Sequence, residues 1–254
     1  AVASLTPAAV GSLDAAQVAA ITTAQAAAIT ATQVDALSAT QIAAITPSSL
    51  AALSAGAVES LSTAQVGAIT ATQAAAITPA QVDSLSTTQL AAITPTALAG
   101  LSATAIGSLD ATQTAAFTAT QVDALLPAQI SAITPEALAG MSEAALASLS
   151  ADQVSALTVA QLGELTEAQI QALSPTALAG LSAEGLAAIT DSLSDAQTTA
   201  LEEVVAAKAI TTEAAKAITA EGVNDLSPTT VSALSPDAVA SLIPAAIGSL
   251  DAAQ

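Results

Sequence analysis

Large aliphatic residues recur every eight positions along most of this chain. Written in octads from Leu5, the sequence reads LTPAAVGS, LDAAQVAA, ITTAQAAA, ITATQVDA, LSATQIAA and so on, through LSAEGLAA at Leu181. The consensus is [LI]-[ST]-x-x-Q-[VIL]-x-[AS], with Phe117 and Met141 as rare variants at position 1. A fixed period of this kind predicts a repeat architecture, in which each unit is stabilised mainly by its neighbours.

The residues with special backbone chemistry keep fixed places in the octad. All ten prolines occupy position 3, sixteen of the seventeen glutamines occupy position 5, and eight of the eleven glycines occupy position 7 or 8. Ser or Thr at position 2 with Gln at position 5 forms a helix capping box. Proline then falls at the first helical position, where its missing N–H costs nothing, and glycine falls where a helix end needs it. The pattern predicts that a new helix begins every eight residues.

A single continuous helix does not fit this pattern. Eight residues advance a helix by a rotation that leaves a drift of ~80° per octad, so no apolar stripe persists. Each interior proline would also cost about 3 kcal/mol. A β-solenoid is disfavoured because the chain is rich in Ala and Gln and lacks an alternating pattern. We therefore expect an all-α solenoid of very short helices, one per octad, each running from position 3 to the next position 1. Positions 6 and 1 should form the core, and small residues at position 8 should permit close approach.

A longer period overlies the octad. Octads beginning at Leu5, Ile45, Ile93, Ile133 and Leu173 all carry Pro at position 3 and lack Gln at position 5. Successive members of this set are five, six, five and five octads apart. We expect a superhelix with an approximate five-octad repeat, which lines equivalent residues along one face. The pattern does not fix the number of octads in a turn.

The array is expected to form one continuous domain with a single interruption. Regular octads cover residues 5–188, an irregular segment covers 189–209, and octads return over 210–254. The nine-residue unit LEEVVAAKA lacks both cap and proline, so residues from about Asp195 to Ala209 are predicted to form one continuous helix.

The irregular segment has two interpretations. It is either a spacer or a lateral docking site. In the second interpretation Lys208 and Lys216, the two lysines of the chain, meet acidic residues of a neighbouring strand, and Glu202 and Glu203 belong to the same contact.

The two ends of the sequence nearly repeat each other. AVASLTPAAVGSLDAAQ (1–17) and AVASLIPAAIGSLDAAQ (238–254) agree at 15 of 17 positions, and the first copy starts at Ala1 and the second at Ala238. We expect the chain to be a window of a longer tandem array, whose large repeat equals the offset between Ala1 and Ala238. Covalent tandem repetition and end-to-end docking of separate chains both remain open at this point.

Composition argues against an enzyme. The chain has no His, Cys or Tyr, so no nucleophile–base pair of the usual kinds is available. Most acidic residues scatter over cap and first-turn positions, where the helix dipole favours them. No calcium loop, phosphate-binding loop or dinucleotide motif is present. We expect no catalytic, cofactor-binding or metal site and no small-molecule substrate.

The acidic net charge of the chain limits the classes of partner that it is expected to bind. The formal net charge is −19, with 21 acidic and 2 basic residues, which disfavours nucleic acid and anionic membrane surfaces. Ser, Thr or Gln interrupts the apolar residues every few positions, so no run approaches the ~18 residues of a membrane span, and no membrane insertion is expected. Another copy of the same chain is the expected partner.

The octads LTPAAVGS and ITATQVDA resemble the [ST]xxQ[VIL]xAL octapeptide arrays of large bacterial exoproteins of the adhesin and haem-utilisation type. The resemblance covers essentially the whole chain. It implies secretion and a role at the cell surface or in an extracellular matrix. It transfers no binding residues, and the lack of His and Tyr disfavours a haem ligand here.

These observations favour an extracellular structural protein that forms a filament, a sheath or an adhesin stalk. Two alternatives come from other classes. Rows of Ser and Thr hydroxyls could bind ice or a polysaccharide, although each hydroxyl already has a role as a cap. An intracellular scaffold solenoid is the other alternative, although the aromatic and Arg anchors usual in such grooves are nearly absent.

Overall fold

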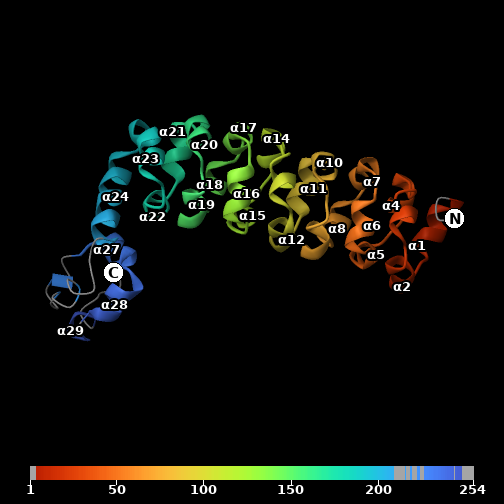
Figure 1. Ribbon diagram of the computed structural model, residues 1–254, viewed down its shortest axis with the longest axis horizontal. Helices are drawn as coiled ribbons and strands as arrows, with labels where there is room; N and C mark the ends of the chain where they lie inside the picture. Colours follow the sequence, from red (N-terminus) through yellow and green to blue (C-terminus); the bar gives the residue numbers. More distant parts are fainter. Residues whose placement is uncertain are drawn as a thin grey trace.

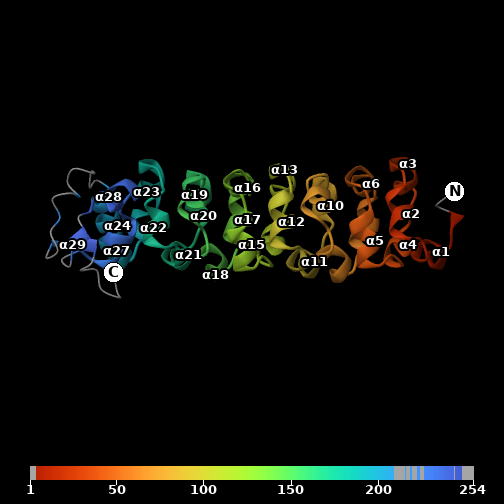
Figure 2. The same ribbon diagram turned by 90° about the horizontal axis from the view of Figure 1, so that it is seen from below.

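The computed structural model describes residues 4–208, 215, 218, 222, 223, 226–242 and 244–247. Within these residues every regular element is a helix, and the helices wind into a long array that extends from the N-terminus at one end (Figures 1 and 2). This confirms the predicted all-α solenoid. The helices are α1 (Pro7–Gly11), α2 (Ala15–Ala19), α3 (Thr23–Ala26), α4 (Ala31–Asp35), α5 (Ala39–Ala44), α6 (Pro47–Ala51), α7 (Ala55–Glu59), α8 (Thr63–Gly67), α9 (Ala71–Ala74), α10 (Pro79–Asp83), α11 (Thr87–Ala92), α12 (Pro95–Gly100), α13 (Ala103–Ile106), α14 (Ala111–Thr114), α15 (Ala119–Asp123), α16 (Pro127–Ala132), α17 (Pro135–Ala139), α18 (Glu143–Leu146), α19 (Ala151–Ser155), α20 (Val159–Glu164), α21 (Glu167–Ala172), α22 (Pro175–Leu178), α23 (Ala183–Ile189), the 3-10 helix η2 (Thr190–Ser192), α24 (Asp195–Lys208), α27 (Pro228–Ala233), α28 (Pro236–Ser241) and α29 (Pro244–Ile247).

Apart from α16, every short α-helix from α1 to α23 begins with the predicted side-chain cap. In α5, the Ser38 hydroxyl accepts a hydrogen bond from the Gln41 amide at 3.2 Å, and Gln41 Oε1 accepts one from the Ser38 amide at 2.6 Å. Asp110 caps α14 in the same way. Proline stands at the start of α1, α6, α10, α12, α16, α17, α22, α27, α28 and α29. The predicted helix starts are therefore confirmed.

The helices end slightly earlier than predicted, because position 1 forms the bend. Ile45 follows α5 with extended backbone (φ −62°, ψ 133°), and its N–H donates to the Ile42 carbonyl oxygen at 3.1 Å. This tight final bond closes the helix, and the extended residue redirects the chain into the next cap. The aliphatic side chain at position 1 thus enters the core from the bend rather than from the helix.

Three octads make one turn of the solenoid. From α1 to α20, each helix packs on the helix three places later, as α2 does on α5, α5 on α8 and α8 on α11. This corrects the expectation that the longer period aligns its members on one face, because five octads are not a whole number of three-octad turns. The proline-bearing octads are consequently spread over all three helix columns, with α1 and α22 in one, α6 and α12 in another and α17 in the third.

The core is a narrow apolar column made by positions 1 and 6, as predicted. At position 6, side chains such as Ile42, Leu90, Ile130 and Leu138 are fully buried, and at position 1 every side chain from Ile21 to Leu181 is at most 8% exposed. Burying each such side chain contributes about 1.5–3 kcal/mol. Helices this short are unstable in isolation, so the stacking of turns is what stabilises them.

The predicted role of glycine is wrong, although the positions are right. No described glycine has a positive φ, so none is needed for a left-handed helix end. With the exception of Gly163, the described glycines at positions 7 and 8 instead lie against the backbone of an adjacent turn. A Cβ at Gly107 would lie 2.6 Å from the Ala132 carbonyl oxygen. At these points the absence of a side chain lets two turns approach.

The interruption of the octads produces a longer helix. After α23 and η2, helix α24 runs for 14 residues and packs against α22 and α27. This confirms the predicted continuous helix as far as Lys208, and Ala209 lies outside the described residues. The array changes direction at α24 (Figure 1).

Candidate functional site: the contact between turns

The glutamine at position 5 joins consecutive turns of the solenoid. Gln121 Oε1 accepts from the amide of Thr118 at 2.9 Å, which completes its own capping box. Gln121 Nε2 donates to the carbonyl oxygens of Leu90 at 2.9 Å and Ile93 at 2.8 Å, in the bend of the preceding turn. One buried side chain therefore caps its own helix and clamps the backbone of the turn before it.

This arrangement repeats along the array, and we call it the glutamine ladder. Every member donates through Nε2 to the backbone of the preceding turn. The members are Gln33, Gln41, Gln65, Gln73, Gln81, Gln89, Gln113, Gln121, Gln129, Gln153, Gln161, Gln169 and Gln197. Each hydrogen bond contributes about 1 kcal/mol net, whereas leaving the buried carbonyls without a donor would cost more. The ladder fixes the register between turns.

Sequence reasoning found only the capping half of this role. The choice of glutamine at position 5 was a signal for the second role, the contact with the preceding turn. A capping box accepts Glu as readily as Gln, yet no octad carries Glu at position 5 in a chain with 21 acidic residues. Glutamine offers both an acceptor and a donor, whereas a carboxylate offers acceptors only. The exclusive use of Gln therefore indicates a second, donor contact.

Octads without glutamine use other contacts between turns. Ser49 takes the place of Gln in α6, and its hydroxyl donates to the Ile21 carbonyl oxygen at 2.7 Å. Ser60 and Ser148, at position 8, donate to the carbonyl oxygens of Ala31 and Ala119 at 3.1 and 2.9 Å.

The longer period marks closely packed helix pairs. Position 6 is small at Ala26, Ala74 and Thr114, in α3, α9 and α14. These helices pack against α6, α12 and α17, which are the proline-bearing helices that lack Gln at position 5. The Thr114 hydroxyl donates to the Ala137 carbonyl oxygen of α17 at 2.5 Å. Where a helix has one of these small residues at position 6, the helix that packs against it from the next turn therefore lacks glutamine at position 5.

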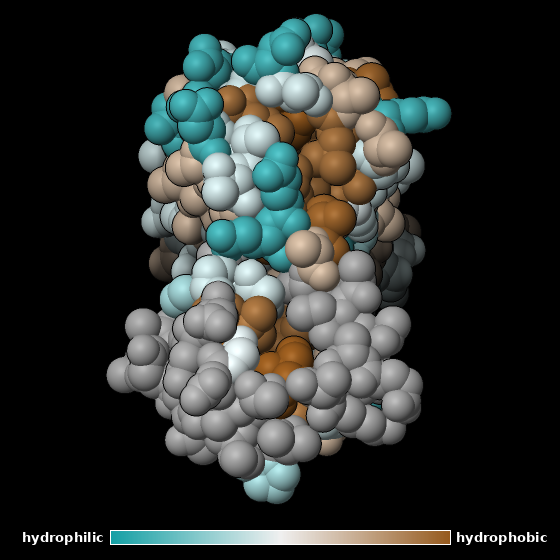
Figure 3. Space-filling model, turned by 90° about the vertical axis from the view of Figure 1, so that its left-hand side faces the viewer, coloured by the Kyte–Doolittle hydropathy of each residue, from teal (hydrophilic) through white to brown (hydrophobic). Residues whose placement is uncertain are grey.

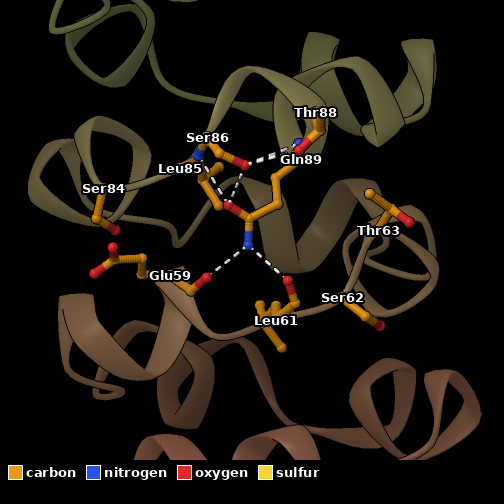
Figure 4. A pocket seen from close by; sticks show the side chains of 9 residues that line it. All are labelled: Glu59, Leu61, Ser62, Thr63, Ser84, Leu85, Ser86, Thr88 and Gln89. Atoms are coloured by element: carbon orange, nitrogen blue, oxygen red, sulfur yellow. Dashed lines mark hydrogen bonds between the residues drawn. The ribbon is translucent and has the colours of Figure 1, made fainter.

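The seam between turns forms a shallow groove on the surface. Figure 4 shows one such groove, in which the Gln89 side chain reaches from Ser86 across to the carbonyl oxygens of Glu59 and Leu61. The hydroxyl of Ser86 interacts with Thr88 Oγ1 and with Gln89 Oε1. The polar groups of the groove therefore hold the turns together.

The four residues predicted for lateral contact lie in and after α24. Glu202 is exposed, and the Glu203 carboxylate accepts a hydrogen bond from the Ser227 hydroxyl at 2.5 Å, which joins α24 to the octad of α27. Lys208 is the last residue of α24, and Lys216 lies outside the described residues. Glu203 thus has an internal role, and lateral contact through the lysines stays a prediction.

Comparison with known proteins gives no assignment. The sequence matches no protein-family model and no curated protein. Among the residues that the structure describes, no helix is both long and apolar enough to cross a membrane, and no group of acidic residues is arranged to hold a metal ion.

Proposed function

We propose that this protein is an extracellular structural element, a filament, sheath or adhesin stalk built from a long solenoid without catalytic activity. The observation that carries the proposal is the glutamine ladder, which links successive turns from Gln33 to Gln197. A column with the same clamp at successive turns resists bending and slippage, and such stiffness is what a load-bearing rod requires.

The location and the partner belong to the same proposal. The resemblance to octapeptide exoproteins supports secretion to the cell surface. The presence of only two basic residues leaves trypsin-like proteases few cleavage sites, which favours persistence outside a cell. A net charge of −19 keeps the lateral surfaces soluble, while further copies of the chain supply the partner.

A surface-binding role is less well supported. The Ser and Thr hydroxyls at position 2 accept hydrogen bonds as helix caps, for example Ser38 from Gln41 and Thr118 from Gln121. They are therefore not free to form an ordered row toward ice or a polysaccharide. Thermal hysteresis above that of an inert protein of equal size would favour this alternative.

Electron microscopy of the native material, together with its denatured molecular mass and its position inside or outside the cell, tests the proposal. Uniform extracellular filaments are the expected result. Short isolated particles with a mass near 24.2 kDa inside the cell would contradict it.

A further inference from the structure

We propose that this solenoid contains a joint: the array held by the glutamine ladder is stiff as far as Gln197, and the chain bends at α24. The inference rests on the stiffness argued for the proposed function, and it divides the structural element into a rod and a flexible connection. Its test uses the isolated chain, so the joint can fail while extracellular filaments exist, and it can hold if they do not.

The glutamine ladder stops at α24. In the regular array, every three successive octads from that of α4 to that of α21 include at least one ladder member. Gln197 is the last member, and no other glutamine occurs before Gln254. Thr230 and Ala238 take position 5 in the octads of α27 and α28. Residues 198–253 therefore lack the side chain that clamps successive turns in the array.

Helix α24 also removes the acceptors that a clamp would need. Ladder glutamines donate to carbonyl groups in the bend of the preceding turn, as Gln121 does to carbonyls 31 and 28 residues before it. The same separations, counted back from Thr230, lead to Thr199 and Glu202, which lie inside α24. Carbonyl groups inside a continuous α-helix already accept the amide four residues later. The long helix thus replaces a bend that could be clamped.

The packing of the turns changes at the same place. Gln197 reaches the Leu173 carbonyl oxygen at 2.9 Å across 24 residues, instead of the 28 residues of the regular ladder. Leu193 and Leu201, at position 1, are half-buried, whereas position 1 is at most 8% exposed from Ile21 to Leu181. Figure 3 faces this end of the molecule and shows apolar side chains in a strip between hydrophilic ones. Less apolar area is therefore buried here to hold neighbouring elements together.

A hydrogen bond between side chains holds α24 to the element after it. The Ser227 hydroxyl donates to the Glu203 carboxylate at 2.5 Å and so ties the cap of α27 to α24. A bond to a carboxylate is stronger than a neutral one. Both residues are only half-buried, however, so water can replace this bond more easily than it can replace the buried amides of the ladder. The bond can therefore open while the array stays clamped.

Bending is expected to concentrate at this interface. Each turn of a solenoid contacts only its neighbours, so a weak interface receives no support from distant turns. The chain already changes direction at α24 (Figure 1). Thermal motion or load should therefore bend the chain at α24 before it bends the array.

Pairs of spin labels measure where the chain bends. The chain has no Cys, so only introduced cysteines are labelled. Ala75 and Ala147 are exposed at position 7, three turns apart in the column of α9, α12, α15 and α18. Ala75→Cys with Ala147→Cys therefore reports on the array. Ala147→Cys with Ala240→Cys, at an exposed site in α28, spans α24. Double electron–electron resonance gives the distribution of distances for each pair.

Four substitutions separate the two kinds of contact. Gln121→Ala removes a clamp between the labels of the array pair, and Thr112→Ala, at an exposed site in α14, is its control. Glu203→Ala removes the bond to Ser227, and Glu202→Ala, at the exposed neighbouring site, is its control. Circular dichroism checks that each labelled variant is folded.

We expect a narrow distribution for the array pair and a broader one for the pair across α24. Glu203→Ala should broaden only the distribution across α24, Gln121→Ala should broaden that of the array, and both controls should match wild type. A wild-type distribution across α24 as narrow as that of the array, or one that Glu203→Ala leaves unchanged, would overturn the joint. An array pair that Gln121→Ala leaves narrow would overturn the ladder as the source of stiffness.

Discussion

Gly100 of α12 lies directly against Ala71 of α9, so that a Cβ atom at position 100 would be only 2.6 Å from the Ala71 carbonyl oxygen. The two residues are one turn apart, and their helices form one of the closely packed pairs that the longer sequence period marks. The contact shows that the longer sequence period reflects how closely two turns pack, and not which face of the solenoid a residue lies on.

Substitution of this glycine should be costly. Gly100→Ala forces the turns apart, and overpacking of this kind destabilises by about 1–3 kcal/mol. Gly163, inside α20, is the matched control because nothing lies within 4 Å of its Cβ position. Gly163→Ala should stabilise by roughly 0.5–1 kcal/mol, as alanine does in a helix interior. Urea denaturation followed by circular dichroism measures both, and equal effects would contradict the close contact.

The donor half of the glutamine ladder can be removed while the cap is kept. Gln121→Glu preserves the capping oxygen but buries a carboxylate against the carbonyl groups of Leu90 and Ile93. We expect a loss of about 3–5 kcal/mol, the usual cost of an uncompensated buried charge. Gln17→Glu at the exposed first turn should change the stability of the monomer by less than about 0.5 kcal/mol. Denaturation midpoints at low protein concentration compare the two, and a similar loss at both sites would mean that the inter-turn bonds contribute nothing.

One helix lacks its cap and should gain from receiving one. Leu126 stands at position 2 before α16, is 54% exposed and makes no side-chain cap bond, although Gln129 Oε1 still accepts from its amide at 2.7 Å. Leu126→Thr should stabilise by about 0.5–2 kcal/mol. Thr158→Val before α20 should lose a similar amount, because Thr158 accepts from the Gln161 amide. Thermal melts would show opposite shifts, and a neutral result at Thr158 would argue against capping as the start signal.

Limited proteolysis should release a stable rod. The two basic residues of the chain are Lys208 and Lys216, so trypsin can cut only after the regular array. Because each turn depends on its neighbours and not on a distant core, residues 1–208 should keep their helical signal after cleavage. Mass spectrometry identifies the fragment and circular dichroism its structure. An unfolded or further degraded fragment would show that the array depends on the C-terminal segment.

Local chemistry explains how much of this fold the sequence could predict. Caps such as Ser38, the prolines at the first helical position and the aliphatic residues of the core act within one octad, so their pattern is readable directly. The number of octads per turn depends on the backbone angles at bends such as Ile45, which residue type alone does not determine. The inter-turn role of Gln121 links it to Leu90 and Ile93, far away in the sequence, and was missed, although the absence of Glu at position 5 carried the information. The sequence analysis assigned the glycines at positions 7 and 8 to helix ends, whereas most of them permit close packing of two turns. Both roles favour glycine, so the residue type alone did not distinguish them.

Helical reconstruction of the assembled filaments by electron cryo-microscopy tests the account most directly. The account predicts solenoid axes that run along the filament, with three octads in each turn and the Nε2 of ladder members such as Gln121 at the carbonyl groups of the preceding turn. Solenoid axes that lie across the filament, or turns that stack without these glutamine contacts, would contradict it.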